Sequence, residues 1–200
     1  INGVYKLQEG KPINQLYVMS VDRIVRDQSD LDYVQSLVDK NPDYFATYQR
    51  PELGDFLYAD ANHDGNLDAN DRIEIGNGNS PSFTFGGNIG ISWKGFDFSI
   101  FMQGIGKRDL WLDGCYFWGA NGQGNEWQST GFAEHWDFFR PEGDPLGANL
   151  NSYYPRVNFS GDRNTKVQTR YLQNGAYLRL KNVQLGYTLP RVWTEKAGIS

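Results

Sequence analysis

A run of short oxygen-bearing side chains between Asp60 and Asp71 is the part of the sequence best suited to chemistry. Counted from Asp60, such side chains fall at positions 1, 3, 5, 9 and 12, and Gly65 stands at position 6, where a calcium loop of the EF-hand type turns sharply. Ca²⁺ prefers roughly six to eight oxygen ligands. The spacing therefore predicts a calcium site with these ligands: Asp60, Asn62, Asp64, the Asn66 carbonyl, Asp68 (through water) and Asp71.

The flanks of this loop differ from those of a helix–loop–helix sensor. Residues 56–58 before it and 72–75 after it have the composition of short strands. Asp71 replaces the usual Glu and is one methylene shorter, so bidentate ligation needs a tighter loop. We therefore expect a structural calcium ion that rigidifies the loop. The alternative is a turn whose Asp, Asn and Gly residues only bond their own backbone.

Aromatic side chains form the second group of candidate binding residues. Four of the six tryptophans lie in the long segment after residue 104, and flat rings of this kind can contact a sugar ring or a partner protein, or pack against one another. These residues are Trp111, Trp118, Trp127 and Trp136. No carboxylate pair, histidine, serine or cysteine in the chain has the neighbours that catalysis requires, so the sequence predicts no enzyme.

The composition narrows the class of protein. Aromatic residues make up 15% of the 200 residues and 23 are glycine, a mixture typical of β-structure with long loops. The net charge of −5 and the absence of a Lys/Arg run argue against nucleic-acid binding. One cysteine excludes an internal disulfide, and no apolar run is long enough for a membrane helix. The chain begins as though in mid-sequence, so we expect a piece of a longer protein.

Two elements can be placed from local pattern. Residues 29–40 are predicted to form a helix, with Ser29 as its N-cap and Leu31, Val34 and Leu37 on one face. Apolar residues alternate with small or polar ones along 83–93 and again along 96–103, on either side of Lys94-Gly95. That pattern predicts a hairpin of two strands of about 9–11 residues, long enough to cross a bilayer when tilted. A soluble β-sandwich hairpin would alternate in the same way.

Connection lengths favour the membrane interpretation. The hairpin turn is minimal, whereas the next connection runs from about residue 104 to about residue 175, and this asymmetry is typical of outer-membrane barrels. A third strand is predicted over 176–190, with Val183 and Leu185 on its apolar face. Leu178 and Leu180 fall on the opposite face in that register. A β-bulge near Lys181, or a strand end above the membrane, would explain the difference.

Three blocks of the sequence together resemble one family. They are Gly54-Asp55-Phe56-Leu57-Tyr58 with the loop that follows it, the hairpin 83–104, and 172–190, which contains Leu-Arg-Leu-Lys-Asn-Val-Gln-Leu-Gly-Tyr-Thr-Leu-Pro and is the most specific. In content, order and spacing they resemble the SusC/RagA family of TonB-dependent outer-membrane transporters. The resemblance covers nearly all of the chain from Gly10 onward.

The resemblance implies an all-β fold: a section of a large antiparallel transmembrane β-barrel with long extracellular loops and one short loop helix. Residues 1–200 would belong to one barrel domain. Within it, 1–80 form a strand and extracellular-loop region with the helix at about 29–40 and the calcium-type loop at 60–71. Residues 81–104 form a transmembrane hairpin, 105–175 a long extracellular loop and 176–190 a transmembrane strand. The plug domain and the final strands would lie outside this chain.

The resemblance also implies a function. The full protein would import glycan or peptide fragments across the outer membrane of a Gram-negative bacterium, with a SusD-like surface lipoprotein as partner and TonB acting through the plug. Its strands would contact outer-membrane lipid and its loops would be extracellular. The alternative is a soluble extracellular calcium-stapled β-sandwich that binds carbohydrate through its tryptophan-rich loop. What covers the apolar face of residues 83–93, lipid or a second sheet, distinguishes the two.

Overall fold

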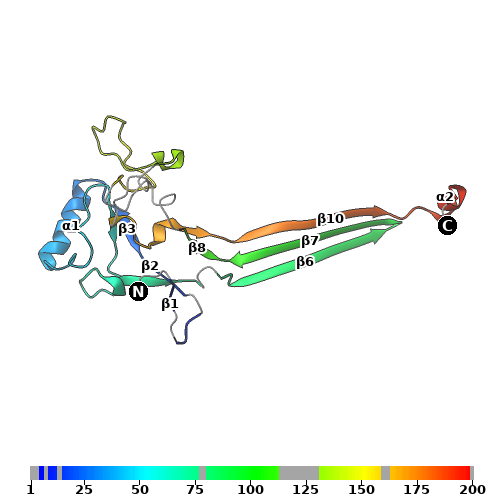
Figure 1. Cartoon of the computed structure of the whole chain (residues 1–200), viewed down its shortest axis with the longest axis horizontal. Helices are drawn as coiled ribbons and strands as arrows, with labels where there is room; N and C mark the ends of the chain where they lie inside the picture. The colour runs from blue at the N-terminus through cyan, green and yellow to red at the C-terminus, as the bar shows by residue number, and fades with distance from the viewer. Residues whose placement is uncertain are drawn as a thin grey trace.

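The computed structural model describes residues 5–6, 9–12, 15–76, 80–112, 131–158 and 163–198. The chain has two parts, a compact head and a long three-stranded sheet that extends away from it (Figure 1). We use "head" for residues 5–6, 15–76, 109–112, 131–158 and 163–174, and "long sheet" for the strands of residues 83–93, 96–107 and 177–187. Among the described residues, no helix combines the length and apolar character needed to cross a membrane.

The long sheet is antiparallel throughout, in the order β10-β7-β6. It consists of β6 (Phe83–Trp93), β7 (Phe96–Lys107) and β10 (Tyr177–Tyr187). Lys94 and Gly95 form the turn between β6 and β7, with φ of 46° and 87°. Two positive φ values are what a two-residue type I′ hairpin requires. A short helix, α2 (Arg191–Lys196), follows β10 at the same end of the sheet.

A β-bulge in β10 keeps one face of the long sheet apolar. The pairing of β10 with β7 shifts register between Leu180 and Asn182, so that Lys181 is the extra residue. As a result Leu180 lies opposite Met102 and Val183 lies opposite Ile100, on the same face of β7. The bulge predicted near Lys181 is therefore confirmed.

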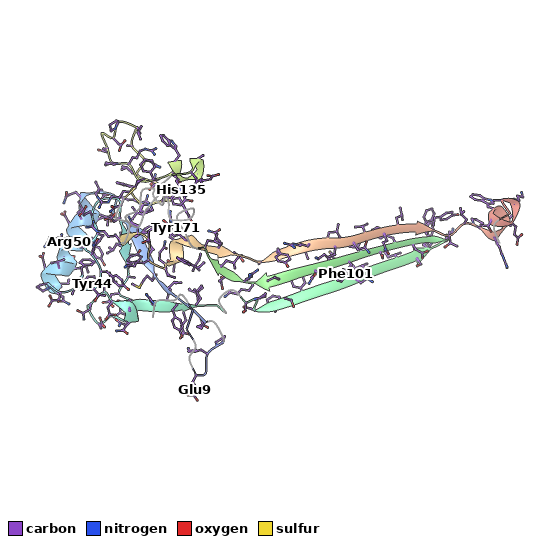
Figure 2. The ribbon with its side chains drawn as sticks, in the orientation of Figure 1. Glu9, Tyr44, Arg50, Phe101, His135 and Tyr171 are labelled. Carbon is purple, nitrogen blue, oxygen red and sulfur yellow. The ribbon has the colours of Figure 1, made fainter. Side chains whose placement is uncertain are left out.

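That apolar face is exposed. Ile91 retains 60% of its accessible surface and Leu185 retains 74%, and in the described part of the chain no second layer covers them (Figure 2). The opposite face is mostly polar: the Ser92 hydroxyl donates to Asp97 at 2.6 Å. Within the part of the chain that the structure describes, both outer strands, β6 and β10, have an unpaired edge. An open sheet of this kind is a section of a larger all-β barrel, whose neighbouring strands complete the pairing.

The head is built from short strands around one helix. Its strands form three sheets: β1-β2-β5, β3-β4 and β8-β9. They are β1 (Tyr5–Lys6), β2 (Gln15–Met19), β3 (Val21–Ile24), β4 (Phe56–Tyr58), β5 (Arg72–Ile75), β8 (Asp109–Trp111) and β9 (Leu172–Asn174). Short 3₁₀ turns lie between these strands in the described residues, at Ala69–Asp71, Ala133–Trp136 and Thr169–Tyr171.

The helix α1 runs from Gln28 to Lys40, close to the predicted range. Its N-cap is Asp27, whose carboxylate accepts a hydrogen bond from the Asp30 N–H at 3.0 Å. The prediction of Ser29 as N-cap was therefore wrong by two residues, because Asp27 offers a stronger acceptor at the position where the backbone is still extended. Val34 is the fully buried residue of the predicted apolar face.

Two segments far apart in sequence make one core in the head. The Met19 N–H donates to the Val167 carbonyl at 2.8 Å, and the Arg156 N–H donates to the Gly54 carbonyl at 2.8 Å. Tyr171 packs in the same buried cluster as Phe56. The described part of the predicted 105–175 loop thus folds against residues 15–76. β7 also continues to Lys107, past the predicted hairpin end at 104.

Candidate calcium-binding loop and the adjoining pocket

The loop 60–71 connects β4 to β5 in the head and is anchored by its own hydrophobic residue. Leu67 is 2% exposed, and its N–H donates to the Tyr44 carbonyl at 2.9 Å. Asp68 and Asp71 form a capping box at the end of the loop: the Asp68 N–H donates to Asp71 Oδ2 at 2.8 Å, and the Asp68 carboxylate accepts from the Asn70 N–H. Burial of Leu67 therefore holds the loop against the core of the head, and the capping box sets where the loop ends and β5 begins.

Two of the predicted ligands, Asp60 and Asp71, are carboxylates near enough to influence one another electrostatically. Asp60 Oδ2 accepts from the Gly65 N–H at 2.9 Å, while Asp60 Oδ1 is buried and has no hydrogen-bond partner among the described residues. Asp71 is fully buried, and its Oδ1 accepts from the Ala61 N–H at 2.9 Å. Burial raises the pKa of Asp71, and the nearby Asp60 carboxylate adds to the increase, against the lowering by backbone hydrogen bonds. Two neighbouring carboxylates repel one another when both are ionised, and a bound cation would relieve that repulsion.

The outer side of the loop is held by local hydrogen bonds. Asn62 Oδ1 accepts from the Asp64 N–H at 3.0 Å, and Asp64 Oδ1 accepts from the Asn66 N–H at 2.8 Å. The hydrogen bond from Asn66 lowers the pKa of Asp64. Gly65 has a φ of 83°, a backbone conformation that suits glycine. These short side chains therefore form hydrogen bonds with the backbone of their own turn, as expected if the loop binds no metal. Their oxygens still have lone pairs that a metal could use.

The donors in this loop fit a hard cation better than a transition metal. Every predicted ligand atom is an oxygen, which suits Ca²⁺, and the buried Asp60 Oδ1 lacks a described partner that a metal would supply. The described residues contain no group of three or more His, Cys, Asp or Glu side chains placed to hold a metal ion. Amide and carbonyl oxygens would therefore have to provide part of any coordination shell.

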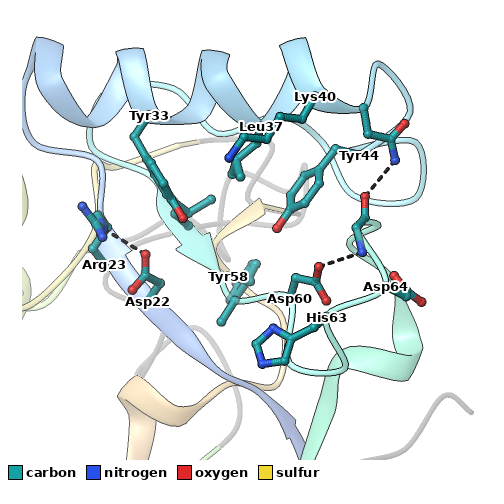
Figure 3. A pocket seen from close by; sticks show the side chains of 14 residues that line it. Asp22, Arg23, Tyr33, Leu37, Lys40, Tyr44, Tyr58, Asp60, His63 and Asp64 are labelled. Carbon is teal, nitrogen blue, oxygen red and sulfur yellow. Dashed lines mark hydrogen bonds and ion pairs between the residues drawn. The ribbon is translucent and has the colours of Figure 1, made fainter.

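A pocket of about 590 Å³ lies between α1, the β3-β4 pair and this loop (Figure 3). Tyr33 and Lys40 reach it from the helix, and Asp60, His63 and Asp64 form the wall on the loop side. The Asn41 side chain closes one end by donating to the Gly65 carbonyl at 2.7 Å. No local sequence pattern marks this pocket, because its lining comes from segments that are distant in sequence and meet only in the fold.

Tyr44 is the most buried aromatic side chain at the pocket that still points its hydroxyl inward (Figure 3). The residue is 6% exposed, and burial, with a smaller contribution from Asp60, raises its pKa to about 12. The hydroxyl therefore stays protonated at physiological pH and can donate a hydrogen bond.

The predicted tryptophan cluster is only partly described. Trp111 lies in β8 opposite Leu172 and is half-buried, with its indole N–H buried. Trp136 is 59% exposed and packs edge-on against Phe138, with the Arg140 guanidinium 5.1 Å from its ring. Trp118 and Trp127 lie outside the described residues. Of the two described members, Trp136 is the one that presents an open ring.

Sequence reasoning missed the charged centre of the head. Asp55 is fully buried and accepts from Arg156 Nε at 2.8 Å, from Arg163 at 3.0 Å and from the Asn164 side chain at 3.0 Å. Glu52, which is more exposed, pairs with the same two arginines at 2.7 and 3.0 Å. The Gly54-Asp55 pair in the first family-like block was the available signal. Its role, joining residues 52–55 to 156–164, depends on contacts across about a hundred residues of sequence.

Comparison with curated proteins identifies relatives of this chain. It is 30% identical to TonB-dependent receptor P26 of Formosa agariphila over 141 residues, which is 69% of this chain and 13% of that protein. It is also 30% identical to TonB-dependent receptor P3 of the same organism over 147 residues, 73% of this chain and 13% of that protein. No protein-family model matches the chain. The chain thus spans only a small part of the length of these relatives.

Proposed function

Because this chain is homologous to TonB-dependent receptors, we propose that the full-length protein is an outer-membrane importer of glycan or peptide fragments. In this proposal it is a SusC/RagA-type transporter that works with a SusD-like surface lipoprotein and draws energy from TonB. The long sheet contributes three strands to the barrel wall, and the head lies on the extracellular side. The finer family assignment rests on the three sequence blocks described above.

The observation that carries the proposal is the uncovered apolar face of the long sheet. Its three strands are 11, 12 and 11 residues long, sufficient to cross a bilayer with the tilt of a barrel strand. Apolar residues on one face and hydroxyl, amide and carboxylate side chains on the other suit lipid outside and a polar lumen inside. A β-sandwich would place a second sheet on the apolar face, and the described residues place none there.

The test is made on the full-length native protein in bacterial envelopes. We expect it in the Sarkosyl-insoluble fraction, with a gel mobility that changes when the sample is boiled in detergent, because a closed barrel resists detergent until heated. A soluble product whose mobility does not depend on heating would refute the membrane assignment and favour the calcium-stapled binding module.

We further propose that the loop 60–71 binds Ca²⁺ through Asp60, Asn62, Asp64, the Asn66 carbonyl, Asp68 and Asp71. The electrostatic proximity of the Asp60 and Asp71 carboxylates and the buried Asp60 Oδ1, which has no described partner, support this assignment. Calcium would neutralise the loop and hold it against Tyr44 and Asn41, which already contact its backbone.

Hydrogen exchange of amides 60–71 in the full-length protein, with calcium or with EGTA, tests this site. Calcium should increase protection in the native protein, and Asp64→Ala should lower the calcium affinity read from that protection by about tenfold or more, because a charged ligand is lost. Asp43→Ala, an exposed carboxylate outside the loop, is the matched control. Equal calcium dependence in Asp64→Ala and the native protein would remove the assignment, and neither variant should change membrane insertion.

We also place a contact with the substrate or the lipoprotein at the open ring of Trp136. Trp136→Ala should weaken capture of the lipoprotein or uptake of the substrate, whereas Trp193→Ala, an exposed tryptophan in α2 at the opposite end of the long sheet, should not. Equal effects of the two changes would argue against a specific contact at Trp136.

A further inference from the structure

The pocket beside the loop 60–71 has the size and the lining of a small-ligand site. Its volume of about 590 Å³ falls within the range of roughly 300–1,000 Å³ that ligand sites occupy. The floor contains the β4 residues Leu57 and Tyr58, which are almost fully buried, so the pocket is built on the core of the head. Figure 3 shows side chains from α1 and from the loop converging on it.

Several polar groups at the pocket have no hydrogen-bond partner within the described part of the chain. The Tyr44 hydroxyl, the Lys40 ammonium and the His63 imidazole all line it, and none forms a hydrogen bond or ion pair with another described side chain. His63 also has a φ of 60°, an uncommon value for a residue other than glycine, and it lies on the loop where the backbone turns. Donors and acceptors gathered in this way can bond the hydroxyl groups of a ligand.

An aromatic ring stands beside these polar groups. Tyr33 reaches the pocket from α1, is 42% exposed and carries the Arg23 guanidinium 4.9 Å from its ring centre. Arg23 is itself paired with Asp22 at 2.9 Å. Three carboxylates and two cations line the pocket, so the charges of the lining largely cancel and suit a ligand without net charge: Asp22, Asp60 and Asp64 against Arg23 and Lys40.

We infer that this pocket binds one ring of a neutral sugar, with an apolar C–H face against Tyr33 and hydroxyl groups bonded to Tyr44, Lys40 and His63. Asp60, His63 and Asp64 belong both to the pocket wall and to the loop 60–71. A cation that orders the loop therefore orders the wall, so sugar affinity increases when calcium is bound, and calcium affinity increases by the same factor when the sugar is bound. This coupling rests on the calcium site proposed above, whereas the pocket itself does not.

The experiment measures binding of methyl glycosides to the full-length protein purified in a detergent without a sugar headgroup. The probes are the methyl glycosides of glucose, galactose, mannose and xylose, titrated by calorimetry with calcium or with EGTA. Tyr44→Phe removes one buried hydroxyl and keeps the ring, so it should weaken binding about fivefold through the loss of one hydrogen bond. Tyr17→Phe is the matched control, because Tyr17 lies on β2 beside Glu74 and outside the pocket.

We expect at least one glycoside to bind, with affinity reduced by Tyr44→Phe and by EGTA and unchanged in Tyr17→Phe. Binding that Tyr44→Phe leaves unchanged, or no binding by any of the four probes, would overturn the pocket assignment. Binding that depends on Tyr44 but not on calcium would overturn the coupling and support the pocket. The calcium site and the barrel are read separately, by hydrogen exchange and by heat-dependent mobility, so failure of either is distinguishable from failure of this inference.

Discussion

The buried carboxylate of Asp55 should contribute more to the stability of the head than any other charged group described. It is fully buried and receives hydrogen bonds from two arginines, from the Asn164 side chain and from the Glu52 N–H. Asp55→Ala would leave those donors without their acceptor. Removing one partner of a buried ion pair typically costs about 3–5 kcal/mol, because the remaining charge stays buried. The lower limit applies here, since Arg156 and Arg163 remain partly exposed and keep Glu52 as a partner.

Hydrogen exchange in the full-length protein is the assay for this prediction. A loss of about 3 kcal/mol corresponds to a decrease of roughly a hundredfold in the protection of β4 amides, which depend on local opening of the head. Glu52→Gln is the matched control: its side chain contacts the same two arginines but is 57% exposed, so we expect a loss of less than about 1 kcal/mol. If Asp55→Ala and Glu52→Gln lower protection equally, or Asp55→Ala by less than about threefold, the argument from burial is wrong.

Three further predictions concern the long sheet and the loop. Leu185→Lys should reduce the folded, heat-modifiable fraction, because a cation that faces lipid costs about 2–4 kcal/mol. Gln184→Lys, on the other face of β10, should leave that fraction unchanged. Equal effects of the two changes would contradict the assignment of the two faces of β10. Deletion of Lys181 should reduce that fraction by moving Leu178 and Leu180 to the polar face, and Lys181→Ala should leave it unchanged; a folded deletion variant would show that the bulge is dispensable. Burial raises the pKa of Asp71, so its protonation stabilises the metal-free loop below pH about 4, and this stabilisation is lost as the pH rises through the raised pKa. In EGTA, exchange protection of the Ala61 and Asp68 amides should therefore decrease across that window in the native protein and less in Asp71→Asn; identical profiles would refute it.

The sequence predicted the long sheet well because its signals are local. Strict alternation along β6, the two-residue turn at Lys94-Gly95 and the mismatch at Leu178 and Leu180 each depend on a few neighbouring residues. Leu178 and Leu180 are out of phase with Val183 and Leu185. Because side chains in a strand alternate between the two faces, one inserted residue returns all four to the same face.

The head was less predictable because its determinants are distant in sequence. The Asp55 contacts with Arg156 and Arg163 join segments about a hundred residues apart, and no periodicity marks such a pair. The spacing of residues 60–71 predicts a calcium-type loop, whereas the pocket beside it depends on where α1 packs. The N-cap error at Ser29 has a smaller cause: Asp27 and Ser29 both suit a cap, and the extended backbone at residue 27 decides between them.

The connection between the head and the long sheet is itself a β-ladder. The pairing of β7 with β10 ends at Ile105 and Tyr177. Beyond it, the Gly175 N–H donates to the Arg108 carbonyl at 2.7 Å. The same two segments of the chain then pair again as β8 and β9. Gly76, at the end of β5, lies so close to the Asp109 side chain that a Cβ would collide with it. The loop 60–71 leads directly into β5, so its exit is tied through Gly76 to the start of β8. The loop 60–71 and the start of the barrel strands are therefore joined by a short run of packed residues.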